Sequence, residues 1–169
     1  LTEVQENVCA TNWQPLEASL VFDRTRSLMI RPTGLDVTDS GLVYVAEEGN
    51  TQTGANMRIS VFDSDGNYIE SFGQRGGAEI TGAAFERPHS VEIGANGNIY
   101  VVDTWNYLIR VFNDQYEQIN VWGQPFSFGI EAPVEPRNGF WGPRDIAIDN
   151  DGNVYISDTG NKRVRVYDA

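Results

Sequence analysis

Residues 151–167 read DGNVYISDTGNKRVRVY. The Asp151-Gly152 pair favours the positive φ angles that a tight hairpin turn needs. Residues 154–158 are short, β-branched and aromatic, and residues 164–167 alternate apolar and basic side chains. Such patterns are typical of β-strands. The stretch therefore predicts a turn followed by two antiparallel strands, with a short loop at residues 159–162.

The same pattern occurs twice more upstream, in the segments ANGNIYVVD (95–103) and DSGLVYVAE (39–47). Pro32, Pro88 and Pro143 precede the three copies at separations of 56 and 55 residues. A third strand follows at 58–62, 109–112 and 164–167, and the first two copies add a fourth strand at 68–73 and 117–123. Internal repetition of this length indicates a repeat architecture. Each copy predicts an antiparallel meander of short strands.

The pattern resembles the NHL repeat: a proline, an apolar strand, Asp-Gly-Asn, Val-Tyr-Val-x-Asp, Thr-x-Asn, a basic residue and Val-x-Val-Phe. The third copy matches it best, and the first has Glu47 in place of the aspartate. The resemblance implies an all-β fold, a β-propeller of NHL type with three four-stranded blades at 31–73, 87–123 and 142–169. It indicates the fold but little about function, because NHL propellers serve many roles.

Three blades do not close a ring, because propellers close with about four to eight. The third copy ends after its third strand, whereas residues 18–22 (ASLVF), in the N-terminal segment 1–30, form an expected strand that would complete another blade. Resembling propellers close in this way. Two alternatives stay open: the chain is part of a larger, six-bladed ring, or other chains complete it, for example a second copy.

The charge balance excludes several classes of partner. Twenty-four acidic residues face twelve basic ones, for a net charge of −12. This field opposes binding to nucleic acid or to an anionic membrane surface. No apolar run approaches the length needed for direct membrane insertion. The acidity, the single lysine and the aromatic loops fit an extracellular or cell-surface location.

Strand alternation places the long loops, residues 48–57, 74–86 and 124–141, on one face of the predicted blades. Concentrated loop length of this kind favours a binding surface, and aromatic residues are good interface anchors. Trp105 and Tyr107 lie at a hairpin tip and are expected to be exposed, whereas Phe85, Phe140 and Trp141 are expected to staple adjacent blades together. The candidate binding-face residues are Trp105, Tyr107, Phe126, Phe128 and Trp141.

Three carboxylates, Glu47, Asp103 and Asp158, each end a second strand on this loop-bearing face. If they converged near the axis they could hold a calcium ion, as acidic ligands do in the six-bladed lactonase-like enzymes that these repeats distantly resemble. The alternative that we favour is that each carboxylate accepts hydrogen bonds from N–H groups of its own loop. No cofactor is then required, and calcium stays the one candidate.

A basic residue also recurs on the third strands, at Arg58, Arg110 and Arg165. A basic stripe for RNA, as in some NHL proteins, is one alternative. At a net charge of −12 we expect these arginines to pair with neighbouring carboxylates instead.

The sequence shows no Gly-x-Ser-x-Gly elbow, phosphate-binding loop or Cys–His pairing. His89 and Cys9 are the only residues of their types, which leaves no multi-histidine or cysteine-based metal site within this chain. We assign no catalytic residue and leave enzymatic activity open. The predicted function is a non-catalytic scaffold that binds protein or glycan through the loop-bearing face, within a larger extracellular or surface assembly.

Two other functions stay open. One is a calcium-dependent hydrolase or lyase of the six-bladed propeller type. The other is a structural subunit that self-assembles into a ring or filament. The expected partner is a protein or further copies of the chain, so that the working form is an oligomer or part of a longer chain.

Overall fold

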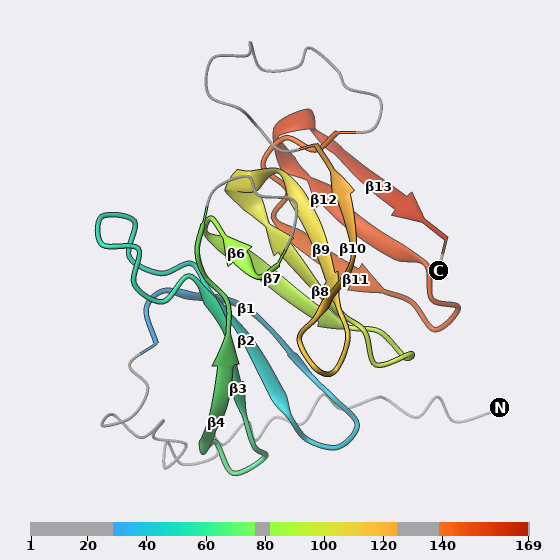
Figure 1. The fold of residues 1–169 in the computed structure, drawn as a ribbon. Coiled ribbons are helices and arrows are strands. Elements are labelled where there is room, and N and C mark those ends of the chain that lie inside the picture. Colours follow the sequence, from blue (N-terminus) through green and yellow to red (C-terminus); the bar gives the residue numbers. More distant parts are fainter. Residues whose placement is uncertain (1–28, 77–81, 125–138, 169) are drawn as a thin grey trace, which may run out of the picture.

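A computed structural model describes residues 29–76, 82–124 and 139–168, which form three antiparallel sheets (Figure 1). Blade 1 comprises β1 (Pro32–Val37), β2 (Val43–Glu47), β3 (Arg58–Phe62) and β4 (Tyr68–Phe72). Blade 2 comprises β7 (Pro88–Ile93), β8 (Ile99–Asp103), β9 (Leu108–Phe112) and β10 (Gln118–Gly123). Blade 3 comprises β11 (Asp145–Ile148), β12 (Val154–Asp158) and β13 (Arg163–Tyr167).

Each sheet is a meander in which consecutive strands pair. The first strands, β1, β7 and β11, lie side by side along the inner edges of the three blades (Figure 1). This arrangement confirms the predicted all-β propeller-type fold. The predicted strand at residues 18–22 lies outside the described residues. The described residues contain no helix with the length and apolar character of a transmembrane span.

The first hairpin of blade 3 shows why the turn sequence matters. Gly152 adopts a φ of 86°. The Asp149 side chain accepts hydrogen bonds from the N–H groups of Asp151 and Asn153, at 3.0 and 2.8 Å. These bonds provide acceptors for the N–H groups of the turn, which lie outside the hydrogen-bonded ladder of the strands. The segment is therefore the hairpin turn that its sequence predicts.

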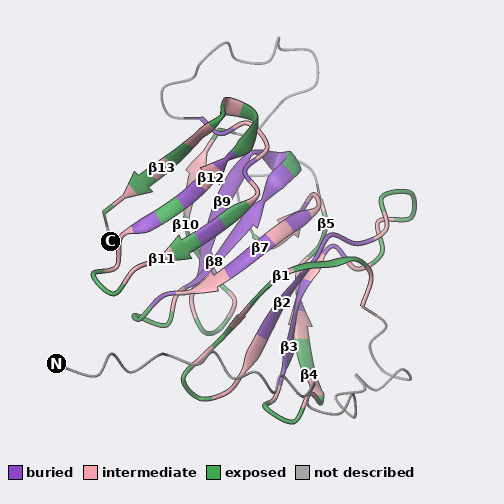
Figure 2. Cartoon of the chain, turned by 180° about the vertical axis from the view of Figure 1, so that it is seen from behind, coloured by how far each residue is buried: buried purple, intermediate pink, exposed green. Residues whose placement is uncertain are grey.

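The core lies between the blades, because each sheet buries one face against the next blade (Figure 2). Between blades 1 and 2 the buried residues are Tyr44, Ala46, Ile59, Val61, Phe72, Phe85, Val91, Ile99, Val101 and Phe112. Between blades 2 and 3 they are Tyr100, Val102, Ile109, Val111, Phe140, Ile146, Val154 and Ile156. A blade is thus stabilised mainly by its neighbours.

The connection from blade 1 to blade 2 contains a pairing that the sequence does not reveal. β5 (Gln74–Arg75) and β6 (Ala84–Phe85) form a two-residue parallel ladder. The ladder places the Phe85 ring directly beside Gly73. If a residue with a side chain replaced Gly73, its Cβ atom would lie 2.3 Å from the ring. Gly73 also adopts a φ of 97°, which side-chain-bearing residues rarely adopt. Two residues are too few to show strand periodicity, so this pairing escaped prediction.

Candidate functional site

The carboxylates of Glu47, Asp103 and Asp158 are completely buried, and each lies within its own blade. In every case one carboxylate oxygen accepts a backbone N–H from the residue 17 positions earlier. The donors are Ile30, Glu86 and Trp141, at 2.7, 2.8 and 2.7 Å respectively. We call this contact the carboxylate clasp. It ties the end of the second strand to the segment that leads into the first.

The other side of each clasp is filled by the second-to-third strand hairpin of the same blade. An asparagine and an arginine donate to the carboxylate in every blade. The pairs are Asn56 with Arg58, Asn106 with Arg110, and Asn161 with Arg163. The clasp is thus closed by side chains of this hairpin and by a backbone N–H from 17 residues earlier, whereas the favoured sequence interpretation expected N–H groups of the carboxylate's own loop.

The clasp arginine changes position between blades, which corrects the predicted equivalence of Arg58, Arg110 and Arg165. In the strand registers Arg58 and Arg163 lie opposite their carboxylates, whereas Leu108 occupies that place in blade 2. Arg110 reaches Asp103 from two residues further along, with 2.7 Å between Nε and Oδ2. Arg165 instead donates to the carbonyl of Gly139 and lies over the Phe140 ring.

The structure does not bring the three clasp carboxylates together around one point. Among the described residues, no group of three histidine, cysteine, aspartate or glutamate side chains is arranged to hold a metal ion. Burial raises the pKa of Asp103 to about 6, while Arg110, Asn106 and the N–H of Glu86 act in the opposite direction. The calcium site stays an untested prediction, and the geometry assigns these carboxylates to the scaffold.

Most of the loop aromatics join blades. Phe85 and Phe140 are buried in the two inter-blade cores, which confirms their expected role. Tyr107 was expected to be exposed, and this was wrong: it is 7% exposed. Its ring stacks on Trp141 at a centroid distance of 5.0 Å and an interplanar angle of 3°. The predicted binding residues Phe126 and Phe128 lie outside the described residues.

Of the candidate binding-face residues that the structure describes, Trp105 is the exposed one, at 40%. It lies in the one-turn helix η1 (Thr104–Asn106) at the tip of the β8–β9 hairpin, and its backbone N–H donates to Glu86. The guanidinium carbons of Arg87 and Arg144 lie over the indole ring, 5.1 and 5.8 Å from its centroid. We call these three residues the Trp105 patch.

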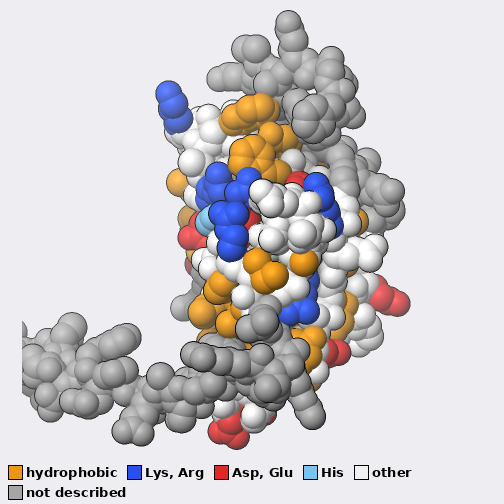
Figure 3. Space-filling view, turned by 90° about the vertical axis from the view of Figure 1, so that its left-hand side faces the viewer, with side chains coloured by type: hydrophobic (Ala, Val, Ile, Leu, Met, Phe, Trp, Pro, Cys, Tyr) orange, Lys and Arg blue, Asp and Glu red, His pale blue; other side chains and the backbone are white. Residues whose placement is uncertain are grey.

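The two arginines of the patch differ in their ionic partners. Arg87 shares the nearly buried carboxylate of Glu48 with Arg31. Among the described residues, no carboxylate lies within ion-pair distance of Arg144. Basic side chains gather on this face beside the histidine, next to hydrophobic ones (Figure 3). The patch is therefore locally cationic on an acidic protein.

Sequence reasoning identified Trp105 but missed the two arginines. The signal was their position beside the repeated proline: Arg87 precedes Pro88, and Arg144 follows Pro143. These positions lie where the chain enters an innermost strand, on the loop-bearing face. A charged residue at the start of that strand can therefore reach the hairpin tip that carries Trp105.

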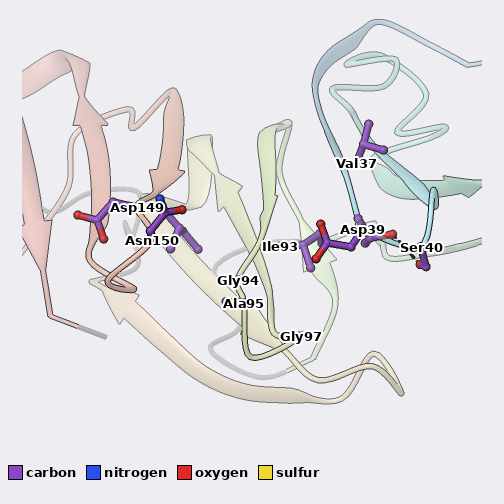
Figure 4. Close-up of a pocket in the computed structure, with 11 residues that line it drawn as sticks. Val37, Asp39, Ser40, Ile93, Gly94, Ala95, Gly97, Asp149 and Asn150 are labelled. Carbon is purple, nitrogen blue, oxygen red and sulfur yellow. Dashed lines mark hydrogen bonds between the residues drawn. The ribbon is translucent and has the colours of Figure 1, made fainter.

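A concave region lies on the opposite face, between the three first-hairpin turns (Figure 4). Its volume is about 510 Å³, and each blade contributes one turn: residues 37–40, 93–97 and 148–150. Asp149 on its wall is already engaged by the N–H groups of its own turn. This pocket was not predicted, because the turns that line it are short.

The inner edges of the blades carry the acidic residues Asp36, Glu92 and Asp145. Burial raises the pKa of Glu92, and the carboxylates of Asp36 and Asp145 raise it further, against a weak hydrogen bond from the N–H of Ile148 at 3.4 Å. The ordinary pKa of a glutamate is 4.5. Because the pKa of Glu92 is raised in the folded state, the folded protein binds more protons at this residue than the unfolded chain does at pH values above 4.5. This group's contribution to stability is therefore lost as pH rises through the folded pKa.

Replacing Glu92 by glutamine is accordingly expected to raise the free energy of unfolding at pH 7. The gain should shrink towards pH 4, because wild-type Glu92 becomes increasingly protonated in both states below the ordinary pKa of 4.5. Urea unfolding at the two pH values measures this difference. Glu117→Gln, at an exposed position, is the matched control, and an equal change in that variant would contradict the assignment to Glu92.

Comparison with known proteins identifies the repeat. The NHL repeat family matches residues 85–112 and 140–167, which correspond to most of blades 2 and 3. The chain therefore contains at least two NHL repeats. Human NHL repeat-containing protein 3 is 25% identical to it over 136 residues, which are 75% of this chain and 35% of that protein. The chain therefore spans about a third of the length of this curated relative.

Solved structures share the fold of this NHL-repeat protein at low identity. A predicted exported protein from Bacteroides fragilis superposes with a TM-score of 0.56 at 16% identity, over 88% of this chain and 38% of that one. A protein of unknown function from Bacteroides thetaiotaomicron gives 0.56 at 16%, over 81% and 47%. A streptogramin B lyase gives 0.50 at 15%, over 82% and 40%. These likenesses concern the fold alone.

Proposed function

We propose that this NHL-repeat protein is a non-catalytic scaffold that binds a protein partner through the Trp105 patch, at an extracellular or cell-surface location. The exposed indole of Trp105, with two guanidinium groups close to its ring, carries the proposal. Tryptophan and arginine are the residue types most enriched among binding hot spots. NHL propellers commonly mediate protein interactions, and a glycan ligand is the alternative on the same face.

The position of the patch supports this role. Trp105 is anchored through its backbone to Glu86, so little freedom is lost when a partner covers the ring. The three clasp carboxylates, which are the candidate calcium ligands of the alternative enzyme, accept hydrogen bonds from arginines of their own blades. We therefore rank the scaffold above the calcium-dependent enzyme.

Selection from a displayed random-peptide library, in parallel with a glycan panel, tests the proposed function. Ligands enriched on the wild-type chain are expected to bind Trp105→Ala at least about tenfold more weakly, since a hot-spot truncation costs about 2 kcal/mol or more. Ile119→Ala, which removes an exposed apolar side chain on the outer strand of blade 2, is the matched control. Equal binding to wild type and Trp105→Ala would reject the patch.

A second function, self-assembly, is favoured by the outward faces of the terminal blades. Val164 and Val166 on β13 are 65% and 56% exposed, although their register equivalents in blade 2, Ile109 and Val111, are buried against blade 3. At the other end of the row, Leu35 is 63% exposed. The residues at the same register position in blades 2 and 3, Val91 and Ile146, are buried against the preceding blade.

We infer that the outward face of blade 3 accepts blade 1 of a second copy, through the contacts that already join blades within the chain. Light scattering is expected to give twice the 18.8 kDa chain mass. Val166→Asp should restore the monomer, whereas Ile119→Asp should not. A wild-type monomer at about 100 μM would exclude this assembly.

A further inference from the structure

We propose that the Trp105 patch recognises a single carboxylate that lies beside an apolar side chain on a peptide segment. In this arrangement Arg144 binds the carboxylate and Trp105 packs against the apolar side chain. The proposal rests on the proposed function and names the chemistry of its ligand.

The backbone of Arg144 is fixed, while its side chain retains donors for a ligand. Its N–H donates to the carbonyl of Ser157 at 3.0 Å. Its own carbonyl lies 3.0 Å from Nδ1 of His89, the equivalent residue of blade 2. Arg144 is half-buried, and among the described residues its guanidinium lies over the indole of Trp105. A positioned guanidinium with unused N–H donors is the group that proteins use for planar anions.

The charges around the patch favour an anion. Arg31 and Arg87 share the single carboxylate of Glu48, which leaves one positive charge of that group uncompensated. Arg144 adds a second. The carboxylate of its sequence neighbour, Asp145, accepts the hydroxyl of Ser90 at 2.8 Å instead.

The geometry of arginine favours a carboxylate. The guanidinium fork donates two parallel hydrogen bonds to the two oxygens of one carboxylate, and such charge-assisted bonds are about twice as strong as neutral ones. A highly charged ligand such as a nucleic acid would meet repulsion from the rest of the chain, whose net charge is −12. A lone carboxylate meets the least repulsion.

The indole of Trp105 provides the contact for the apolar side chain of the ligand. Two-fifths of its surface is exposed next to the guanidinium groups, and aromatic faces at protein interfaces contribute mainly by burying apolar surface. A ligand that satisfies both groups carries an acidic and an apolar side chain within one or two residues. This favours a peptide segment over an acidic sugar, whose ring offers less apolar surface.

The test uses two blocked tripeptides, acetyl-Phe-Asp-Phe-amide and its asparagine counterpart. The indole N–H signal of Trp105, assigned by its loss in Trp105→Ala, reports binding in NMR titrations. The aspartate peptide is expected to bind wild type roughly ten- to a hundredfold more tightly than the asparagine peptide. Arg144→Gln should remove that preference and leave the affinity for the asparagine peptide unchanged. Lys162→Gln, which removes another positive charge from this face, should preserve the preference.

Each contrary outcome has a defined meaning. Equal affinities for the two peptides, no shift with the aspartate peptide up to about 10 mM, or an unchanged preference in Arg144→Gln would overturn carboxylate recognition. Loss of the preference in Lys162→Gln would assign it to overall charge and overturn it too. Tighter, Arg144-dependent binding of trigalacturonate would replace the peptide with an acidic glycan. The proposed function fails separately, when library ligands are indifferent to Trp105→Ala.

Discussion

Replacing Asp103 by alanine is expected to lower the free energy of unfolding by about 3–5 kcal/mol at pH 8. The variant removes the carboxylate that forms an ion pair with the completely buried guanidinium of Arg110. It also leaves the side chain of Asn106 and the N–H of Glu86 without the acceptor that they share. At pH 8 the Asp103 carboxylate is ionised, since its pKa is raised only to about 6. The full ion pair is therefore present in the wild type.

Urea unfolding followed by tryptophan fluorescence measures this loss. Asp114→Ala, in an exposed turn, is the control and should change the unfolding free energy by less than about 0.5 kcal/mol. The double variant Asp103→Asn/Arg110→Met removes both charges and should recover a large part of the stability, because an apolar side chain then fills the place of the arginine. If the double variant were as unstable as Asp103→Ala, loss of the Asp103–Arg110 ion pair would not be the cause.

Replacing Phe85 by alanine is expected to cost about 3–5 kcal/mol through the cavity that it leaves. The ring is completely buried between blades 1 and 2, with edge contacts to Phe72 and Phe112 at centroid distances of 6.2 and 5.9 Å. Its near edge fills the space beside Gly73. Neighbouring side chains cannot collapse into that space without moving a sheet.

Thermal and urea unfolding of Phe85→Ala and Phe85→Leu test this role. The leucine variant fills part of the volume and should lose clearly less stability than the alanine variant. Ile119→Ala, at a side chain that is 52% exposed, should have little effect. Similar losses in all three variants would show that Phe85 does not join the blades.

The fold could be predicted because its signals repeat. Three prolines at nearly constant separation, each followed by a glycine turn and an alternating strand, fix the number and order of the hairpins. The β5–β6 ladder could not be predicted, since two residues carry no periodicity. The strand at residues 18–22 stays a prediction outside the described residues.

The candidate site was harder to predict, because side-chain reach is not a property of sequence spacing. Tyr107 and Trp105 occupy the same hairpin tip, yet one ring turns inward onto Trp141 and the other stays in solvent. Arg110 serves its clasp from a position that holds Ser60 in blade 1. Which of two neighbouring residues faces the protein depends on the next blade, which a single repeat does not contain.

In every blade the carboxylate clasp joins two residues that are 17 positions apart in the sequence. Closing so short a segment costs little chain entropy, and local contacts of this kind form early. A nascent chain would therefore close the first hairpin of one blade before the next blade has been synthesised. The apolar face of that first blade would stay exposed to solvent until the next blade has been synthesised and packs against it. The blades would then fold one after another, from the N-terminal blade to the C-terminal blade.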